Sequence, residues 1–241
     1  MTLSNRKILR TLLCLLAGTL YAVCLSACDA KEPLSENRDA EIESPVIAND
    51  LSNQKVTAIA EDTQGHIWIG TFRGLNKNNV HDYHQYFCTD DSLGLPDNQI
   101  THLLRDSKNR FWVGTVNGVC LYTDKDNFRI IPIEADNKNV RQILEDRNGR
   151  IFLNTGFQLY AYHPREEKIT CVLPEISPGN AFYAQCHIAP DNNLWVMTST
   201  GLRCYDPSTL QLKESVALSG YPYYSYLHNN ELWITGNHRS E

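Results

Sequence analysis

The sequence has no cluster of basic residues. Its 241 residues contain 22 Lys and Arg against 28 Asp and Glu, which gives a net charge of -6 at pH 7. Most of the acidic excess lies in residues 29–50, where seven acidic residues stand against two basic ones. Without a stripe of Lys and Arg, the chain lacks the electrostatic footprint that nucleic-acid binding requires. DNA and RNA are therefore excluded as expected partners.

The sequence also lacks the short motifs of common catalytic sites. It has no G-x-S-x-G, no Walker loop, no H-E-x-x-H and no complete calcium-binding loop. His81 and His84 are three residues apart, which on a strand directs them to opposite faces. Asp124-Lys-Asp126 lacks the following Gly and distal Glu of a calcium loop and is predicted to be a hairpin turn. We expect no catalytic residue, no metal and no cofactor, although a carboxylate pair from distant loops stays open as an alternative.

The cysteines do not form a recognisable framework. Three of the eight belong to the N-terminal segment, and the remaining five show no C-x-x-C spacing: Cys88, Cys120, Cys171, Cys186 and Cys204. Because their number is odd and they sit at different points of the chain, we expect small buried apolar residues, with one disulfide or a reactive thiol as the alternative.

The N-terminus has the order of an export signal. Arg6, Lys7 and Arg10 precede an apolar run over residues 12–25, and Ser26-Ala-Cys28 follows. Leu25-Ser-Ala-Cys28 resembles the lipobox of bacterial lipoproteins, which implies a signal peptide over residues 1–27 and a lipid on Cys28. An uncleaved anchor or an ordinary secretory signal are the alternatives. Residues 28–50 are expected to form an acidic linker.

After this linker the chain repeats itself. Residues 56–71 return as residues 100–115, and further copies occupy 140–155 and 183–198, with a fifth starting near residue 221. The copies are anchored by Trp68, Trp112, Phe152, Trp195 and Trp233. These aromatic residues recur about every 40 residues, a period typical of four-stranded propeller blades. The sequence therefore predicts an all-β fold, a partial β-propeller over residues 51–241.

One repeat predicts one blade. Apolar and polar residues alternate over Val56–Glu61, Asp62–Gly65 has turn chemistry, and Ile67–Thr71 forms a second strand with a large flat aromatic residue. A third strand begins at Leu75. Outer strands are expected over residues 83–87, 128–131 and 168–172. We expect the aromatic residue of each of the first four copies to pack in the core between neighbouring sheets.

The run Gly94–Thr101, followed by Asp106, Trp112-Val-Gly-Thr115 and Gly118, resembles the two-component regulator propeller repeat. This repeat builds the sensor regions of Bacteroidetes-type hybrid histidine kinases, in which an immunoglobulin-like domain, a membrane span and a kinase follow. The third copy departs with Phe152-Leu-Asn-Thr155, and the fourth has Ala189 in place of the turn Asp. Because relatives build rings of seven blades, the resemblance implies a truncated or partial member. The chain is expected to be a fragment of a longer sensor, or an open stack completed by a propeller or homodimer partner.

The resemblance implies an exported ligand-sensing segment of a two-component system, acting on an oligosaccharide without chemistry of its own. A lipid-anchored protein-interaction platform and, less favoured, a glycan-active enzyme are the alternatives. The expected location is the periplasm or the outer membrane, or the inner membrane facing the periplasm if the signal stays uncleaved.

A ligand is expected on the face that carries the turns after the second strand and the connections between blades. The candidate side chains combine aromatic rings, an amide and one guanidinium, which suits a carbohydrate: Arg73, Asn117, Phe182, Tyr183, Tyr221, Tyr223 and Tyr224. The alternative is that the tyrosines only pack at blade edges.

Overall fold

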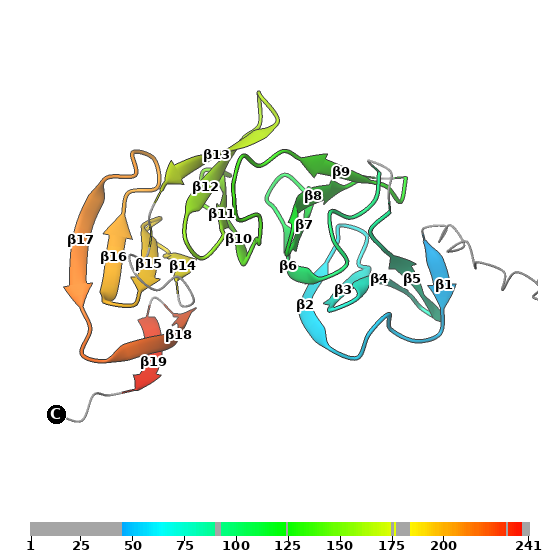
Figure 1. The fold of residues 1–241 in the computed structure, drawn as a ribbon, viewed down its shortest axis with the longest axis horizontal. Helices are drawn as coiled ribbons and strands as arrows, with labels where there is room; N and C mark the ends of the chain where they lie inside the picture. The colour runs from blue at the N-terminus through cyan, green and yellow to red at the C-terminus, as the bar shows by residue number, and fades with distance from the viewer. Residues whose placement is uncertain are drawn as a thin grey trace, which may run out of the picture. The chain divides into compact units, whose positions relative to one another are not determined.

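The computed structural model describes residues 45–89, 93–123, 125–174, 176, 184–229 and 231–237. All of its strands belong to one compact unit, residues 42–241, while the unit of residues 1–41 lies outside the described residues. The described part is all-β and contains five antiparallel sheets (Figure 1). None of its ranges contains a helix that could cross a bilayer.

Three sheets are four-stranded blades in which neighbours along the chain are neighbours in the sheet. Blade 2 comprises β6 (Ile100–Arg105), β7 (Phe111–Thr115), β8 (Gly118–Tyr122) and β9 (Phe128–Ile131). Blade 3 comprises β10 (Gln142–Glu145), β11 (Ile151–Asn154), β12 (Leu159–His163) and β13 (Lys168–Leu173). Blade 4 comprises β14 (Gln185–Ile188), β15 (Leu194–Thr198), β16 (Gly201–Tyr205) and β17 (Leu212–Ala217). The predicted four-stranded blades are confirmed.

Blade 1 has five strands. β2 (Val56–Glu61), β3 (Ile67–Thr71), β4 (Gly74–Asn79) and β5 (Asp82–Tyr86) follow the repeat, and β1 (Val46–Ala48) pairs with β5 at the outer edge. Between β1 and β2 the chain is held on the sheet: Ser52 N donates to Asn76 Oδ1 at 2.8 Å, and Gln85 Nε2 donates to the Asp50 carbonyl at 2.7 Å. Blade structure therefore begins inside the segment 28–50 that the sequence indicated as linker.

The fifth repeat contributes β18 (Tyr221–His228) and β19 (Glu231–Asn237), a two-stranded sheet that we call blade 5. Trp233 occupies the repeat's aromatic position but is 61% exposed, whereas Trp68 and Trp112 are fully buried. Trp195 in blade 4 is only half-buried, so the expectation of a core position holds fully for the aromatic residues of the first three blades. Trp195 faces the two-stranded blade 5, whereas Trp233 lies in blade 5 itself, beyond which the described residues form no further sheet.

The core consists of three clusters, each drawn from two neighbouring blades. Trp68 packs with Leu103 and Val113 between blades 1 and 2, Trp112 with Leu153 between blades 2 and 3, and Phe152 with Val196 between blades 3 and 4. The first strands of consecutive blades also contact each other. One large ring per blade fills the space between stacked sheets, as the repeat predicted.

The turn after each first strand has a recurring hydrogen-bond pattern. Asp106 Oδ1 accepts from the backbone of Lys108 at 3.0 Å and of Arg110 at 2.9 Å, while Oδ2 accepts from Trp112 Nε1 at 2.8 Å. Asn109 closes this turn with a φ of 61°, a left-handed conformation that Asn tolerates. The turn aspartate thus fixes both the backbone and the ring that fills the core.

Blades 3 and 4 lack part of this pattern. Phe152 has no ring N–H, and Asp146 Oδ2, which would accept it, is a buried oxygen without a hydrogen-bond partner among the described residues. Blade 4 has Ala189 at the turn, although the backbone bond from Asn192 N to Ala189 O, 2.8 Å, is kept. The turn itself therefore survives the loss of the carboxylate.

The cysteines divide into two groups. Cys120, Cys186 and Cys204 are buried, as expected of small apolar residues, while Cys88 and Cys171 are exposed. Burial raises the pKa of the Cys186 thiol to about 12.

Candidate functional site

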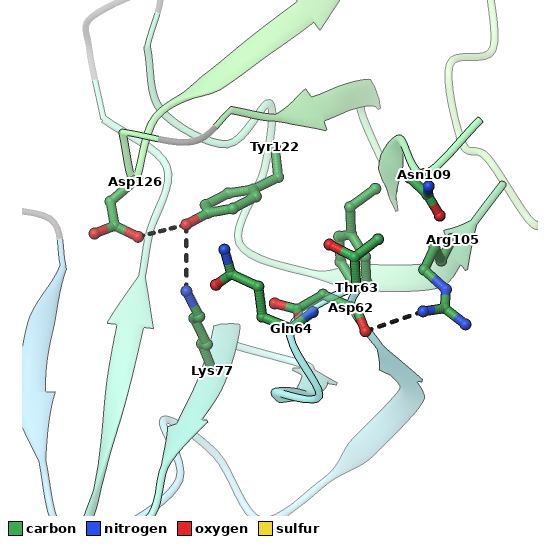
Figure 2. A pocket seen from close by; sticks show the side chains of 9 residues that line it. Asp62, Thr63, Gln64, Lys77, Arg105, Asn109, Tyr122 and Asp126 are labelled. Atoms are coloured by element: carbon green, nitrogen blue, oxygen red, sulfur yellow. Dashed lines mark hydrogen bonds between the residues drawn. The ribbon is translucent and has the colours of Figure 1, made fainter. Parts of the chain in front are cut away.

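A hollow of about 280 Å³ opens between blades 1 and 2, on the side of the aspartate turns. We call it the seam hollow. Its walls come from the first turns of both blades, from β4, and from the end of β8 with the turn that follows (Figure 2): Asp62, Thr63, Gln64, Lys77, Arg105, Asn109, Phe111, Tyr122 and Asp126. Hydroxyl, amide, ammonium and guanidinium groups thus face two aromatic rings.

Asp62 is the turn aspartate of blade 1, and its carboxylate already has several donors. Oδ2 accepts from Trp68 Nε1 at 2.9 Å, and Oδ1 accepts from the backbone of Gln64 at 2.9 Å and of His66 at 3.0 Å. Burial by itself would raise the pKa of this carboxyl, but the hydrogen bonds from Trp68, His66 and Gln64 outweigh it and lower the pKa. Asp62 is therefore an anion whose hydrogen-bond donors all belong to blade 1.

Asp126 joins the two blades. Its Oδ1 accepts from the hydroxyl of Tyr86, on β5, and from the hydroxyl of Tyr122, at the end of β8, both at 2.7 Å. Burial opposes ionisation of Asp126, but the two tyrosine hydroxyls and, more weakly, the charge of Lys77 lower its pKa. Burial and the bond to Asp126 raise the pKa of both tyrosines, which stay protonated donors.

Two cations line the hollow. Lys77 Nζ lies 5.3 Å from the ring centroid of Trp68 and 5.4 Å from that of Tyr122, and it donates to the Tyr122 hydroxyl at 3.4 Å. Arg105, at the end of β6, donates from Nη1 to the Asp62 carbonyl at 3.1 Å. Both contacts appear as dashed lines in Figure 2.

The seams between blades 2 and 3 and between blades 3 and 4 show why the seam between blades 1 and 2 is open. Four residues after the turn aspartate, blade 2 has Arg110, whose guanidinium lies 5.1 Å from the Trp112 ring and 5.2 Å from the Tyr162 ring, across the seam to blade 3. Blade 3 has Arg150 at the same position, and it donates to the Pro207 carbonyl of blade 4. Blade 1 has His66 there, which hydrogen-bonds back to its own Asp62 at 3.1 Å. His66 thus replaces the arginine that covers the seams between blades 2 and 3 and between blades 3 and 4.

A second hollow, of about 300 Å³, occupies the corresponding place between blades 4 and 5. Here the residue after the turn is Asn193, again not an arginine. Leu227 of β18 pairs with Leu232 of β19, and Arg105 pairs with Phe111 at the equivalent position of blade 2. Leu227 therefore takes the place of the arginine, and Leu232 that of the aromatic ring. This second hollow is mainly apolar, with Asp191 in its lining, whereas the seam hollow carries charged groups on several walls.

The residues predicted as a ligand site do not gather in the seam hollow. Arg73 and Asn117 are exposed in the β3–β4 and β7–β8 turns, on the opposite face. That face carries the blade connections as predicted, since Gly74 N donates to the Asn98 carbonyl at 2.7 Å. Tyr223 and Tyr224 are exposed on β18. Phe182 and Tyr183, the Tyr221 side chain and Cys28 lie outside what the structure describes.

Sequence reasoning missed the seam hollow, although one signal was present. Lys77 on the third strand of blade 1 pairs with Trp68 on the second strand. The equivalent residues of blades 2, 3 and 4 are Leu121, Ala161 and Cys204, so blade 1 has a charged residue where the other three have an uncharged one. In the described part of the chain, His, Cys, Asp and Glu side chains do not gather in groups of three or more that could hold a metal ion. The hollow offers hydrogen-bonding groups, charges and two ring faces.

Comparison with known proteins agrees with the repeat. Residues 50–73 and 94–117 match the family described as Two component regulator propeller. Each segment covers the first strand, the aspartate turn and the second strand of its blade, blade 1 and blade 2 respectively. No protein of curated function matches the sequence.

Several solved structures share the fold. The extracellular domain of a protein described as a hybrid two-component system from Bacteroides thetaiotaomicron is 21% identical, with a TM-score of 0.61 over 76% of this chain and 26% of that one. Virginiamycin B lyase from Staphylococcus aureus is 18% identical, with a TM-score of 0.60 over 79% and 67% of the two chains. An auxiliary nutrient binding protein from Bacteroides thetaiotaomicron is 10% identical, with a TM-score of 0.51 over 74% and 46%. The chain spans about a quarter of the length of the first of these structures. At these identities the likeness shows the propeller fold.

Proposed function

The chain carries repeats of the two-component regulator propeller family, and from this premise we propose that it is the exported, ligand-sensing segment of a two-component signalling system. The observation that carries the proposal is the match of residues 50–73 and 94–117 to this family. The fold shared with the extracellular domain of a hybrid two-component system supports it. The ligand class that we propose is an oligosaccharide.

The seam hollow supports a saccharide ligand. Thr63, Gln64 and Asn109 offer a hydroxyl and two amides for directed hydrogen bonds to sugar hydroxyls, and Phe111 and Tyr122 offer ring faces for stacking. Its volume of about 280 Å³ is near the lower end of small-molecule sites, which suits one sugar unit of a longer chain. The loop face with Arg73 and Asn117 is the second candidate surface.

The position of the hollow gives a route to signalling. Its walls belong to two blades that are bridged by Asp126 and its two tyrosine partners, so a ligand that spans the seam changes how tightly the blades are held. A ligand can bias such an arrangement only through a difference in its affinity for the two states. In this proposal, parts of the signalling system outside this chain pass the bias through the membrane.

The N-terminal segment supports export. Arg6, Lys7 and Arg10 followed by the apolar run and Cys28 give the order of a lipoprotein signal, and we propose that Cys28 carries the lipid at the periplasmic or outer-membrane surface. Cell fractionation and mass spectrometry test this point. A lipid-modified peptide beginning at Cys28, absent from C28A, is expected, whereas an unmodified cytoplasmic chain would refute export.

The functional test is genetic. Cells in which the gene is deleted are grown on a panel of neutral and acidic oligosaccharides, and transcription is compared with that of the parent strain. We expect the loss of one saccharide-induced response and its return on complementation. Unchanged induction by every saccharide would refute the sensing role.

A catalytic propeller is the second candidate function, because virginiamycin B lyase shares the fold over most of both chains. A fold does not decide function by itself. Incubation of the full chain with the oligosaccharide that it binds, followed by mass spectrometry, separates the two. A sensor returns the saccharide intact, while a glycan-active enzyme releases products. If neither binding nor products are seen, a lipid-anchored interaction platform is the remaining candidate.

A further inference from the structure

The hydrogen-bonding groups of the seam hollow are unevenly used. The two carboxylates that line it already have their donors: Asp62 accepts from Trp68, Gln64 and His66, and Asp126 accepts from Tyr86 and Tyr122. Because carboxylates only accept, both oxygens of Asp62 and Oδ1 of Asp126 already have donors within the protein. The two negative charges of the hollow are thus partly offset by the protein itself.

The donors are not engaged to the same degree. Lys77 has three N–H groups and one hydrogen bond, of 3.4 Å, to the Tyr122 hydroxyl. Arg105 has five N–H groups and one hydrogen bond, from Nη1 to the Asp62 carbonyl. Most of the donor capacity of the two cations is therefore directed at solvent or at a ligand. A group that fits is one that accepts several hydrogen bonds and carries negative charge.

Lys77 stands where the other blades have Leu121, Ala161 and Cys204, so packing between blades does not require a charge there. Taking its ammonium out of water costs free energy unless a partner offsets it. The rings of Trp68 and Tyr122, at 5.3 and 5.4 Å, and the charge of Asp126 offset part of this cost. The acidic group of a ligand would provide the rest.

We propose that the seam hollow binds the acidic group of an acidic saccharide, a carboxylate or a sulfate ester, between Lys77 and Arg105. This inference rests on the proposed function, since it names the chemical class of the oligosaccharide. Lys77 supplies an ammonium at the β4 wall and Arg105 a guanidinium at the β6 wall, which can bind two oxygens of one anion. The sugar ring then packs against Tyr122 and Phe111.

Binding of three probes to the full chain, measured by calorimetric titration, tests the proposal. The probes are tri-galacturonic acid, a 6-sulfated galactotriose and neutral galactotriose, and trimethyl tri-galacturonate is the uncharged match of the first. K77Q and R105Q each remove one cation, and R165Q removes one from the exposed turn between β12 and β13 of blade 3 as the matched control. Circular dichroism and urea unfolding show that each variant is folded.

At least one acidic probe is expected to bind more tightly than its neutral match. K77Q and R105Q are each expected to weaken this binding about tenfold or more, the effect of losing a charge-assisted hydrogen bond, while R165Q leaves it unchanged. Preference for the galacturonate or for the sulfate identifies which acid is bound. Equal binding of neutral and acidic probes, or acid binding that K77Q and R105Q leave intact, overturns this inference and leaves the proposed function standing. Failure of every saccharide to bind overturns both.

Discussion

Replacing the turn aspartate by asparagine is expected to have different costs in two neighbouring blades. In blade 2, Asp106 Oδ2 accepts from Trp112 Nε1 at 2.8 Å and from Arg110 Nε at 2.6 Å, and the carboxylate is fully buried. In blade 3, Asp146 Oδ1 accepts from the same two backbone positions, but Oδ2 has no partner among the described residues. D106N and D146N are thus the same substitution at equivalent turns.

The magnitudes follow from the donors. An asparagine side chain has one acceptor oxygen where the carboxylate has two. In D106N this oxygen accepts either from the two backbone N–H groups or from Trp112 Nε1 and Arg110 Nε, and the other two donors face the NH₂ group. A hydrogen bond to a charged group contributes about 1.5–3 kcal/mol, and Arg110 is partly solvated, so we expect a loss of about 3 kcal/mol. In D146N the amide oxygen keeps both backbone bonds, and an unpaired anionic oxygen is removed, so the loss stays within about 1 kcal/mol.

Urea unfolding of both variants and of the parent chain checks this prediction. A difference of about 2 kcal/mol should appear in the free energy of unfolding at equal m values. For a unit of about 200 residues, it corresponds to a difference of about 4–8 °C in Tm. Equal losses in the two variants would refute the reasoning, because they would mean that the Trp112 and Arg110 bonds contribute nothing beyond the backbone turn.

Three further predictions concern the seam hollow and the thiols. The pKa of Asp126 lies below its usual 3.8 in the fold, so its contribution to stability is complete above that pH and is lost as the pH falls through the folded value; acid unfolding followed by fluorescence should therefore show a weaker dependence in D126N. The double variant H66R/K77L gives blade 1 the residues that blade 2 has at these positions, Arg110 and Leu121. It should abolish saccharide binding in calorimetry and change the free energy of unfolding by about 1 kcal/mol or less. Unchanged binding would show that the ligand does not bind in the seam hollow. At pH 8, iodoacetamide should label the exposed Cys171, while Cys186 should react only after the chain unfolds, because burial raises its pKa to about 12. Equal labelling of the two thiols in peptide mass spectrometry would contradict the burial of Cys186.

The blade pattern could be predicted from the sequence because each repeat contains local signals for its strands and for the turn between the first two. Alternating residues, a turn aspartate, a left-handed Gly or Asn and one large ring recur at fixed offsets. The first strands of blades 1, 2 and 5 begin at the predicted repeat starts, and those of blades 3 and 4 begin two residues later. β1 could not be predicted in this way. It has three residues, Val46–Ala48, and no counterpart in the other repeats, and only its pairing with β5 makes it a strand.

The seam hollow was beyond prediction from one repeat at a time. Its walls combine Lys77 from β4 of blade 1 with Tyr122 of β8 and Asp126 of the following turn in blade 2, about 45 residues further along the chain. Their meeting depends on how two sheets stack, and no local period encodes that. An alignment of the repeats on their paired positions does carry a signal, since Lys77 and His66 are the positions at which blade 1 departs from Leu121 and Arg110.

The exposed aromatic residues of blade 5 show a further limit. Trp233 follows an apolar residue and precedes another, as the buried Trp68 and Trp112 do, yet it is 61% exposed. A ring is buried only when the next sheet covers it, so its environment depends on the neighbouring blade and not on its own repeat.

The most direct test of the sensing site is backbone hydrogen exchange of the full chain, with and without the panel saccharide that binds most tightly. If the seam hollow is the ligand site, bound saccharide should slow exchange in residues 62–66, 105–111 and 122–128. Protection confined to the turns at residues 72–74 and 116–118 would place the ligand on the opposite face and contradict the assignment.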